Sequence, residues 1–253
     1  MNEKPSKRDT MSLGELKDNW DGFGRTDPLW SILTDPDKRG NKWSAQEFFD
    51  TGSKDIDDLM NRASRFDACF LRGKALDFGC GVGRLTQPLC AYFDEVHGVD
   101  IAPSMIELAN TYNRHPDSCT YHLNESGGLS MFPDGEFDLV YTSRTLQHME
   151  PQYARVYLRE FVRILRPGGL LAFQVPDSPD YRHIGNKLRK AAPAFVIRAF
   201  RKLAYGRGPR MEMHTIPREE VIDMLEGEGA KLLAVENDES ARQFISYVFY
   251  ASK

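Results

Sequence analysis

The sequence contains no apolar run of about 18 residues, the length that a helix needs to cross a bilayer. Its opening residues, MNEKPSKRDTMSLGELKDNWDGFG, are polar and lack the apolar core of a secretory signal, so we expect a cytoplasmic protein. Cysteine is also scarce. The four cysteines form no CxxC pair and have no clustered histidines around them; they are Cys69, Cys80, Cys90 and Cys119. Neither a disulfide framework nor a zinc site is predicted.

Three parts of the chain differ in composition. Residues 1–20 carry many charges and few large apolar side chains, so we expect a flexible tail. Residues 21–70 combine aromatic residues, turn-forming Asp-Pro and Gly residues, and apolar residues at helical spacing, which predicts a helical extension. Residues 71–253 are predicted to form the main domain, with a basic helical insertion at 177–213. Within it, residues 182–210 carry nine lysines or arginines and no acid.

The main domain alternates strand patterns with helix patterns. Strands are predicted at KALDFG, EVHGVD, CTYHLN, FDLVYTS and LLAFQVP, and helices at RLTQPLCAYF, PSMIELANTYNRH, PQYARVYLREFVRILRPGG and IPREEVIDMLEGEGA. This alternation predicts an α/β fold with a parallel sheet that helices cover on both faces. The last two strand patterns, KLLAVEN and FISYVFYAS, have no helix between them and predict an antiparallel hairpin at the sheet edge.

Glycine is concentrated in ALDFGCGVGRLT, residues 75–86, where Gly79, Gly81 and Gly83 alternate. Three glycines this close disrupt a strand or a helix, so they predict a tight turn whose bare backbone a ligand can approach. In an open α/β sheet such a turn holds a nucleotide-type ligand. The dinucleotide fingerprint needs a small residue where this chain has Arg84, which weakens a nicotinamide-dependent dehydrogenase as an alternative.

Four blocks in order resemble one enzyme family. LDFGCGVGRLT, VHGVDIAPSMIELA, FPDGEFDLVYTSRTLQHM and LREFVRILRPGGLLAFQVP, within residues 74–176, are similar to the motifs of class I S-adenosylmethionine-dependent methyltransferases, of the bacterial small-molecule or saccharide type. The resemblance implies a Rossmann-like, mostly parallel sheet of seven strands and S-adenosyl-L-methionine as cofactor. It implies O-methylation of a saccharide or other small hydroxylated acceptor. Nitrogen or carbon acceptors, and a scaffold that binds cofactor without turnover, are the alternatives.

Two carboxylates end strands beside the predicted cofactor. Asp77 can accept from the amides of the turn or from the amino group of the cofactor's methionine part, or it can only brace the loop. Asp100 ends the second strand, where a carboxylate can accept from both ribose hydroxyls. The resemblance implies that Ile101, next to it, touches the adenine ring.

Later positions complete the predicted cofactor site. Asn124 and Glu125 stand where similar enzymes read the adenine amino group, and the sequence leaves open which of them does so. Ser143, by resemblance, lies near the sulfonium. The full predicted set is Asp77, Gly79, Cys80, Gly81, Asp100, Ile101, Met105, Asn124, Glu125 and Ser143.

Two histidines are candidates for the base that removes the acceptor's proton. Transfer from a sulfonium to oxygen needs in-line placement and loss of that proton, and histidine can accept it near neutral pH. His148, after the fourth strand, is the first candidate, with a structural role as the alternative. His214, in MEMHTIP, is the second, with a surface position as the alternative. No acidic cluster stands beside the glycine turn, so no metal is predicted.

The basic stretch 182–210 bears on the partners. It is predicted to be a solvated helix over the pocket, a lid whose arginines hold an anionic acceptor, or a helix that lies on an anionic membrane near a lipid-linked acceptor. Nucleic acid is not a predicted partner, because the chain is acidic overall and its basic residues are confined to this stretch. The oligomeric state is left open.

Overall fold

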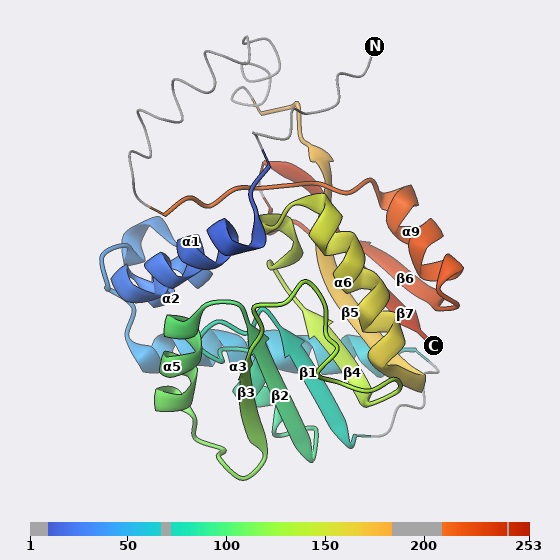
Figure 1. Cartoon of the computed structure of the whole chain (residues 1–253), viewed down its shortest axis with the longest axis horizontal. Helices are drawn as coiled ribbons and strands as arrows, with labels where there is room; N and C mark the ends of the chain where they lie inside the picture. The colour runs from blue at the N-terminus through green and yellow to red at the C-terminus, as the bar shows by residue number, and fades with distance from the viewer. Residues whose placement is uncertain (1–9, 67–71, 184–208, 242) are drawn as a thin grey trace.

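The computed structural model describes residues 10–66, 72–183, 209–241 and 243–253 (Figure 1). Seven strands form one sheet in the order β3-β2-β1-β4-β5-β7-β6. Pairing is parallel from β3 to β5, whereas β7 runs antiparallel to both β5 and β6. The strands are β1 Lys74–Phe78, β2 Glu95–Asp100, β3 Cys119–Leu123, β4 Phe137–Thr142, β5 Leu165–Pro179, β6 Lys231–Asn237 and β7 Phe244–Ser252. The predicted fold class, with its antiparallel edge hairpin, is confirmed.

Helices connect the strands and precede the sheet. They are α1 Leu13–Thr26, α2 Pro28–Ile32, α3 Ala45–Ala63, α4 Thr86–Leu89, α5 Pro103–Tyr112, α6 Pro151–Ile164 and α9 Arg218–Gly227, with 3₁₀ turns η1 Pro36–Lys38 and η2 Leu146–His148. Within the described ranges, no helix has the length and apolar character needed to span a bilayer. Most of the predicted basic helical segment, residues 184–208, lies outside the described residues, as does Cys69.

The sheet is buried between two helical layers. In Figure 1, α6 and α9 lie in front of the sheet and α3 lies behind it. Successive residues on a strand face opposite sides, and β1 follows this rule. Leu76 packs in one apolar cluster with Phe161 of α6, while Ala75 packs in another with Ile56 of α3. The alternating burial of both faces fixes the register of the central strands.

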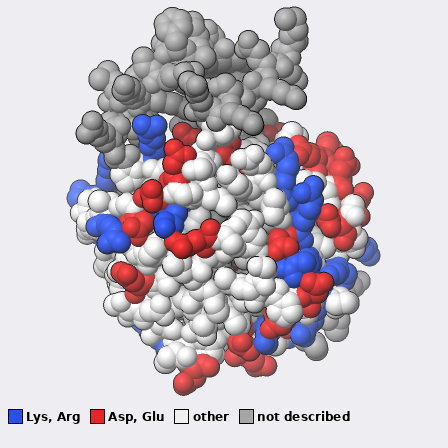
Figure 2. All heavy atoms as spheres, in the orientation of Figure 1, with Lys and Arg blue, Asp and Glu red and all other residues white. Residues whose placement is uncertain are grey.

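Ion pairs join α6 to α9 at the surface. Arg155 pairs with Glu220, and Arg159 Nε lies 3.4 Å from Glu228 Oε1. Figure 2 shows lysines and arginines interspersed with acidic side chains on this face. Because exposed pairs of this kind contribute only about 0–1 kcal/mol each, the buried apolar contacts hold α6 on the sheet.

The N-terminal residues correct the predicted organisation. The sequence predicts a flexible tail over residues 1–20, but α1 begins at Leu13. Ser12 Oγ accepts from the Glu15 N–H and the Glu15 carboxylate accepts from the Ser12 N–H, a reciprocal cap that satisfies the first turn. Leu16 is buried against the main domain, and Asp21 Oδ1 accepts from the Ser104 N–H at 2.9 Å. The helical extension therefore starts earlier than predicted.

The helix predicted at RLTQPLCAYF is also shorter than expected. Only Thr86–Leu89 is helical, and the next residues form turns in which the N–H groups of Cys90 and Ala91 bond three residues back.

Candidate functional site

The glycine turn follows β1 and is bonded to the end of β2. The N–H groups of Gly79 and Cys80 donate to the Val99 carbonyl at 2.7 and 3.0 Å. The Gly81 N–H donates to Asp100 Oδ2 at 2.9 Å. These bonds hold the turn against the carboxyl end of β2, where the predicted ribose acid lies.

Glycine is required in this turn for two reasons. Gly79 and Gly81 have φ of 74° and 54°, in the left-handed region that side chains disfavour. A Cβ atom on Gly79 would lie 2.2 Å from Thr145 Cγ2, and one on Gly81 would lie 2.6 Å from Ile32 Cδ1. The turn therefore keeps its backbone bare at the floor of a cavity.

That cavity, called here the turn cavity, has about 950 Å³ of empty space including its mouth. Most of the predicted cofactor residues line its wall: Gly79, Cys80, Gly81, Asp100, Ile101, Met105, Asn124 and Ser143. Asp77 and Glu125 do not line it.

Asp100 is the acidic side chain on the wall of the turn cavity. Its Oδ2 accepts from the Gly81 N–H and its Oδ1 accepts from the Ala102 N–H, both at 2.9 Å. Burial raises the pKa of Asp100, and these amide bonds oppose the rise. Each carboxylate oxygen has a second lone pair that can accept a further hydrogen bond.

The structure separates the two residues predicted to read adenine. Asn124 is buried at the cavity wall, where its Nδ2 donates to the Gly128 carbonyl at 2.9 Å and its Oδ1 accepts from the Ser126 hydroxyl at 2.6 Å. Glu125 points to the surface and pairs with Lys17 Nζ at 2.7 Å. Of the two, Asn124 is the residue placed to contact a ligand.

Asp77 lies beneath the turn rather than in the cavity. It is 1% exposed, and its Oδ2 accepts from the Thr86 hydroxyl at 2.6 Å. Burial raises the pKa of Asp77 to about 6. Its bonding matches the bracing alternative, because Thr86 begins α4 and this contact ties α4 to the end of β1.

One wall of the turn cavity comes from α1, which the sequence analysis did not include. Leu13, Leu16 and Trp20 of this helix line the cavity. They recur at i, i+3 and i+7, so they form one face of a helix. That spacing, together with the Ser12 to Glu15 cap, was the signal that could have identified them.

His148 belongs to a chain of buried hydrogen bonds. The Arg144 N–H can only donate, and it donates to Gln174 Oε1 at 3.1 Å. The Gln174 amide nitrogen therefore donates to Gln147 Oε1 at 3.2 Å, and the Gln147 amide nitrogen donates to His148 Nε2 at 3.1 Å. His148 Nδ1 carries the proton, which it donates to the Glu212 carbonyl at 2.8 Å. The network fixes one neutral tautomer.

Burial lowers the pKa of His148 to about 4. The side chain is 8% exposed, and its ring lies 5.3 Å from the Trp20 ring in an edge contact. A neutral imidazole whose Nε2 already accepts a hydrogen bond is a weak base. The role of His148 as a base remains a prediction.

We predict that His148 makes stability depend on pH. An unfolded histidine titrates near pH 6.5, whereas folded His148 stays neutral down to about pH 4. Between these values the unfolded chain binds one more proton than the folded protein, so the free energy of unfolding decreases as the pH is lowered. Stability is therefore lost as the pH is lowered: from about pH 7.5 down to about pH 5, the wild-type chain should lose roughly 2 kcal/mol of unfolding free energy that a His148→Asn variant does not lose. Urea denaturation at both pH values measures the difference, and equal losses would contradict the prediction.

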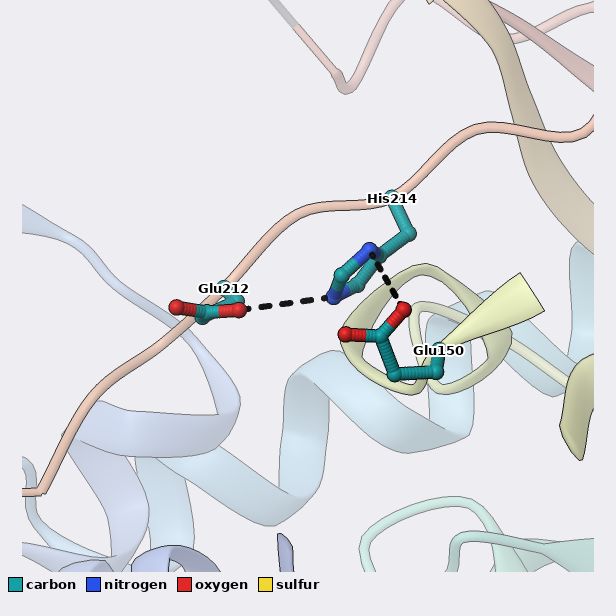
Figure 3. A group of neighbouring side chains, drawn as sticks. All are labelled: Glu150, Glu212 and His214. Atoms are coloured by element: carbon teal, nitrogen blue, oxygen red, sulfur yellow. Dashed lines mark ion pairs between the residues drawn. The ribbon is translucent and has the colours of Figure 1, made fainter. Parts of the chain in front are cut away.

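His214, the second candidate base, lies outside the wall of the turn cavity. The backbone N–H of His214 donates to the Gln147 carbonyl at 2.7 Å. Figure 3 shows its ring between two carboxylates, with Nδ1 3.9 Å from Glu150 Oε2 and Nε2 3.7 Å from Glu212 Oε2. One atom able to bind a metal from each of Glu150, Glu212 and His214 lies within 4.8 Å of the other two. The statement that the protein binds no metal therefore stays a prediction.

A second cavity, called here the outer cavity, adjoins the turn cavity. It has about 990 Å³ of empty space including its mouth. The two cavities share Ser31, Ile32, Arg144 and His148. The rest of the outer cavity wall is mixed, with apolar Leu33, Trp43, Met211, Met213 and Ala241 beside polar Thr34, Asp35, Gln147 and Ser240. A ligand in the outer cavity would therefore meet one in the turn cavity beside His148 and Arg144.

Residues 76–173 match the family model of a methyltransferase domain. They carry the glycine turn, Asp100 and the segment after β4 that builds the cavities. This chain contains a class I S-adenosylmethionine-dependent methyltransferase domain. The match begins within β1 and ends within β5, so the helices of residues 13–63 and the segment 209–216 lie outside the matched range.

Curated relatives of the methyltransferase domain act on small molecules, as their names state. A 2-methyl-6-phytyl-1,4-hydroquinone methyltransferase of Synechocystis is 26% identical over 174 residues, which cover 68% of this chain and 54% of that protein. A trans-aconitate 2-methyltransferase of Methylobacterium radiotolerans is 37% identical over 106 residues, which cover 41% of this chain and 38% of that protein. The chain thus spans about half or less of these relatives.

Solved structures share the fold over most of the chain. A magnesium protoporphyrin IX methyltransferase of Synechocystis with bound SAH superposes with a TM-score of 0.64 at 15% identity, covering 96% of this chain and all of that one (100%). An S-adenosylmethionine-dependent methyltransferase of Leishmania major gives a TM-score of 0.65 at 14% identity, covering 95% and 82%. At this identity the likeness concerns the fold of the methyltransferase domain.

Proposed function

We propose that the protein transfers a methyl group from S-adenosylmethionine to an oxygen of a small hydroxylated acceptor, a saccharide among the candidates. The observation that carries this proposal is the junction of the two cavities at Arg144 and His148. The turn cavity has the residues to hold the cofactor, and the outer cavity opens beside it, where an acceptor could lie. The named substrates of the curated relatives, a hydroquinone and trans-aconitate, support a small acceptor.

The residues of the turn cavity fit S-adenosylmethionine. The free lone pairs of Asp100 would accept from the ribose hydroxyls, and the apolar side chains of Ile101 and Met105 would contact adenine. Ser143, at the end of β4, would lie near the sulfonium. The bare backbone at Gly79 and Gly81 would leave room for the cofactor.

When bound, this cofactor supplies an activated methyl group, and its transfer forms a C–O bond, leaves the C–S electron pair on sulfur and frees the acceptor's proton. The walls of the two cavities then have to align the acceptor and exclude water. Trp20 and Ile32, from the N-terminal helices, line the turn cavity, so this extension contributes part of that wall.

His148 is better suited to hold the wall than to remove a proton. Its Nε2 would have to exchange the Gln147 amide for the acceptor hydroxyl before it could act as a base. Its lowered pKa leaves a small driving force for proton transfer. We propose that His148 positions the η2 turn and the segment of Glu212.

Labelled S-adenosylmethionine offered with a panel of hydroxylated acceptors tests the proposed function. Methyl transfer to any oxygen acceptor, with formation of S-adenosylhomocysteine, would support it. Failure of the protein to bind either cofactor form in calorimetry would overturn it. A His148→Asn variant assayed in parallel separates the roles of this residue, because loss of a general base lowers kcat by about 100-fold or more.

We predict that Asn124 and Glu125 contribute unequally to cofactor binding. Asn124→Ala should weaken S-adenosylmethionine binding about tenfold, since one buried hydrogen bond and the order of the Ser126 loop are lost. Glu125→Ala is the matched control and should change the dissociation constant by less than about twofold, because Glu125 pairs with Lys17 at the surface. Calorimetric titration measures both, and the reverse order would assign adenine to Glu125.

A further inference from the structure

Arg144 lies at the junction of the two cavities. It lies after β4, is half-buried and lines both cavity walls. Among the residues that the structure describes, its guanidinium has no hydrogen bond or ion pair. Arg84, also on the turn cavity wall, differs, because its Nη1 lies 2.7 Å from Asp55 Oδ2. None of its side-chain nitrogens is among the buried polar atoms without a partner, so the guanidinium is open to the cavities and free to take an anionic group of a ligand there.

The backbone of Arg144 is held in an unusual conformation. Its φ is 60°, in the left-handed region that residues with a side chain disfavour. The N–H of Arg144 is bonded to the buried Gln174 side chain, whose amide nitrogen also donates to Ser246 Oγ at 2.6 Å. Strain that the surrounding structure holds in place is typical of functional positions. At the cavity junction the left-handed position is occupied by an arginine, although glycine or asparagine adopts this backbone conformation more readily.

Little else in the outer cavity wall is charged. Asp35 lines it, but its Oδ1 accepts from the Asp37 N–H at 2.9 Å and begins the η1 turn. His148 is neutral near physiological pH, and its Nδ1–H is bonded to the Glu212 carbonyl. Leu33, Trp43, Met211 and Met213 supply apolar surface. Of the described residues, Arg144 is therefore the fixed cation that an acceptor would meet.

We propose that Arg144 is the specificity-determining residue for the acceptor and binds a carboxylate on it. The acceptor is then a small hydroxylated acid, whose apolar body lies on Trp43 and the two methionines while its carboxylate takes the planar guanidinium in a two-point bond. This inference rests on the proposed function, because it names the class of acceptor for that same site. Arg144 holds the carboxylate at one end and so fixes which hydroxyl faces the methyl donor.

Calorimetry on the S-adenosylhomocysteine complex tests this inference with pairs of acceptors that differ only in charge. Glucuronate is compared with glucose, and para-hydroxybenzoate with para-hydroxybenzamide. In the wild-type complex, at least one acid should bind about tenfold or more tightly than its neutral partner. Arg144→Asn, which tolerates the left-handed backbone, should abolish this preference, and Arg144→Lys should keep part of it.

Arg114→Asn is the matched control, because Arg114 is exposed and lines neither cavity. It should leave the preference for the acid unchanged. The inference is wrong if no acid binds the complex, if acids and neutral partners bind equally, or if Arg144→Asn behaves as Arg114→Asn does. Loss of S-adenosylhomocysteine binding by the wild-type protein would instead overturn the proposed function, so the two failures are distinguished in the same titration.

Discussion

Replacing Asp100 with alanine should weaken S-adenosylmethionine binding at least about 100-fold, because each hydrogen bond to a charged group contributes roughly 1.5–3 kcal/mol and two ribose bonds are lost. The carboxylate is also the acceptor for the N–H groups of Gly81 and Ala102. Its removal therefore takes away the ligand bonds and one of the bonds that shape the turn. Calorimetric titration with S-adenosylmethionine and S-adenosylhomocysteine measures the loss for both cofactor forms.

Two further variants make the Asp100 result specific. Asp100→Asn keeps the shape and one carbonyl oxygen but loses the charge, so its binding should be intermediate. Asp117→Ala removes an exposed acid outside both cavity walls and should bind the cofactor as the wild type does. If Asp100→Ala bound within about threefold of the wild type, the ribose assignment would be wrong and the turn cavity would take another ligand.

Of the residues predicted from the sequence, those that line the turn cavity lie mostly at the ends of central strands. Gly79, Gly81 and Asp100 follow short buried strands, and the carboxyl ends of parallel strands meet at one edge of the sheet. Position along the chain is then enough to place them together. It is not enough to decide which way a side chain points. Asp77 faces Thr86 beneath the turn, whereas its neighbour Phe78 lines the cavity.

The parts of the site that were missed depend on contacts between distant residues. Gln174 bonds the Arg144 backbone across 30 residues, and Glu212 bonds His148 across 64. No local pattern encodes such pairs. The wall formed by α1 is a different case, because its charged residues led to the prediction of a tail, whereas the spacing of Leu13, Leu16 and Trp20 is that of one helix face. For residues 13–20 the charged composition predicts a tail and the apolar periodicity indicates a helix, and the structure has the helix.

Gly79→Ala should both destabilise the fold and abolish the turn cavity. The left-handed φ of 74° adds roughly 1–2 kcal/mol for any residue with a Cβ atom. The new methyl group would lie 2.2 Å from Thr145 Cγ2 and 2.7 Å from Thr145 Cβ, so rotation of the threonine cannot relieve the contact and the segment after β4 must move. We expect an unfolding free energy lower by about 3 kcal/mol and S-adenosylmethionine binding at least about 100-fold weaker.

Gly229→Ala separates backbone strain from the steric contact. Gly229 has a similar φ of 83°, but a Cβ atom there would have nothing within 4 Å. This variant should lose only about 1 kcal/mol of stability and bind cofactor normally, since the alanine meets strain without a clash. Urea denaturation and calorimetry on both variants compare the two effects. Equal losses of stability with unchanged binding would mean that the segment of Thr145 yields freely, and that Gly79 is needed for its backbone angle alone.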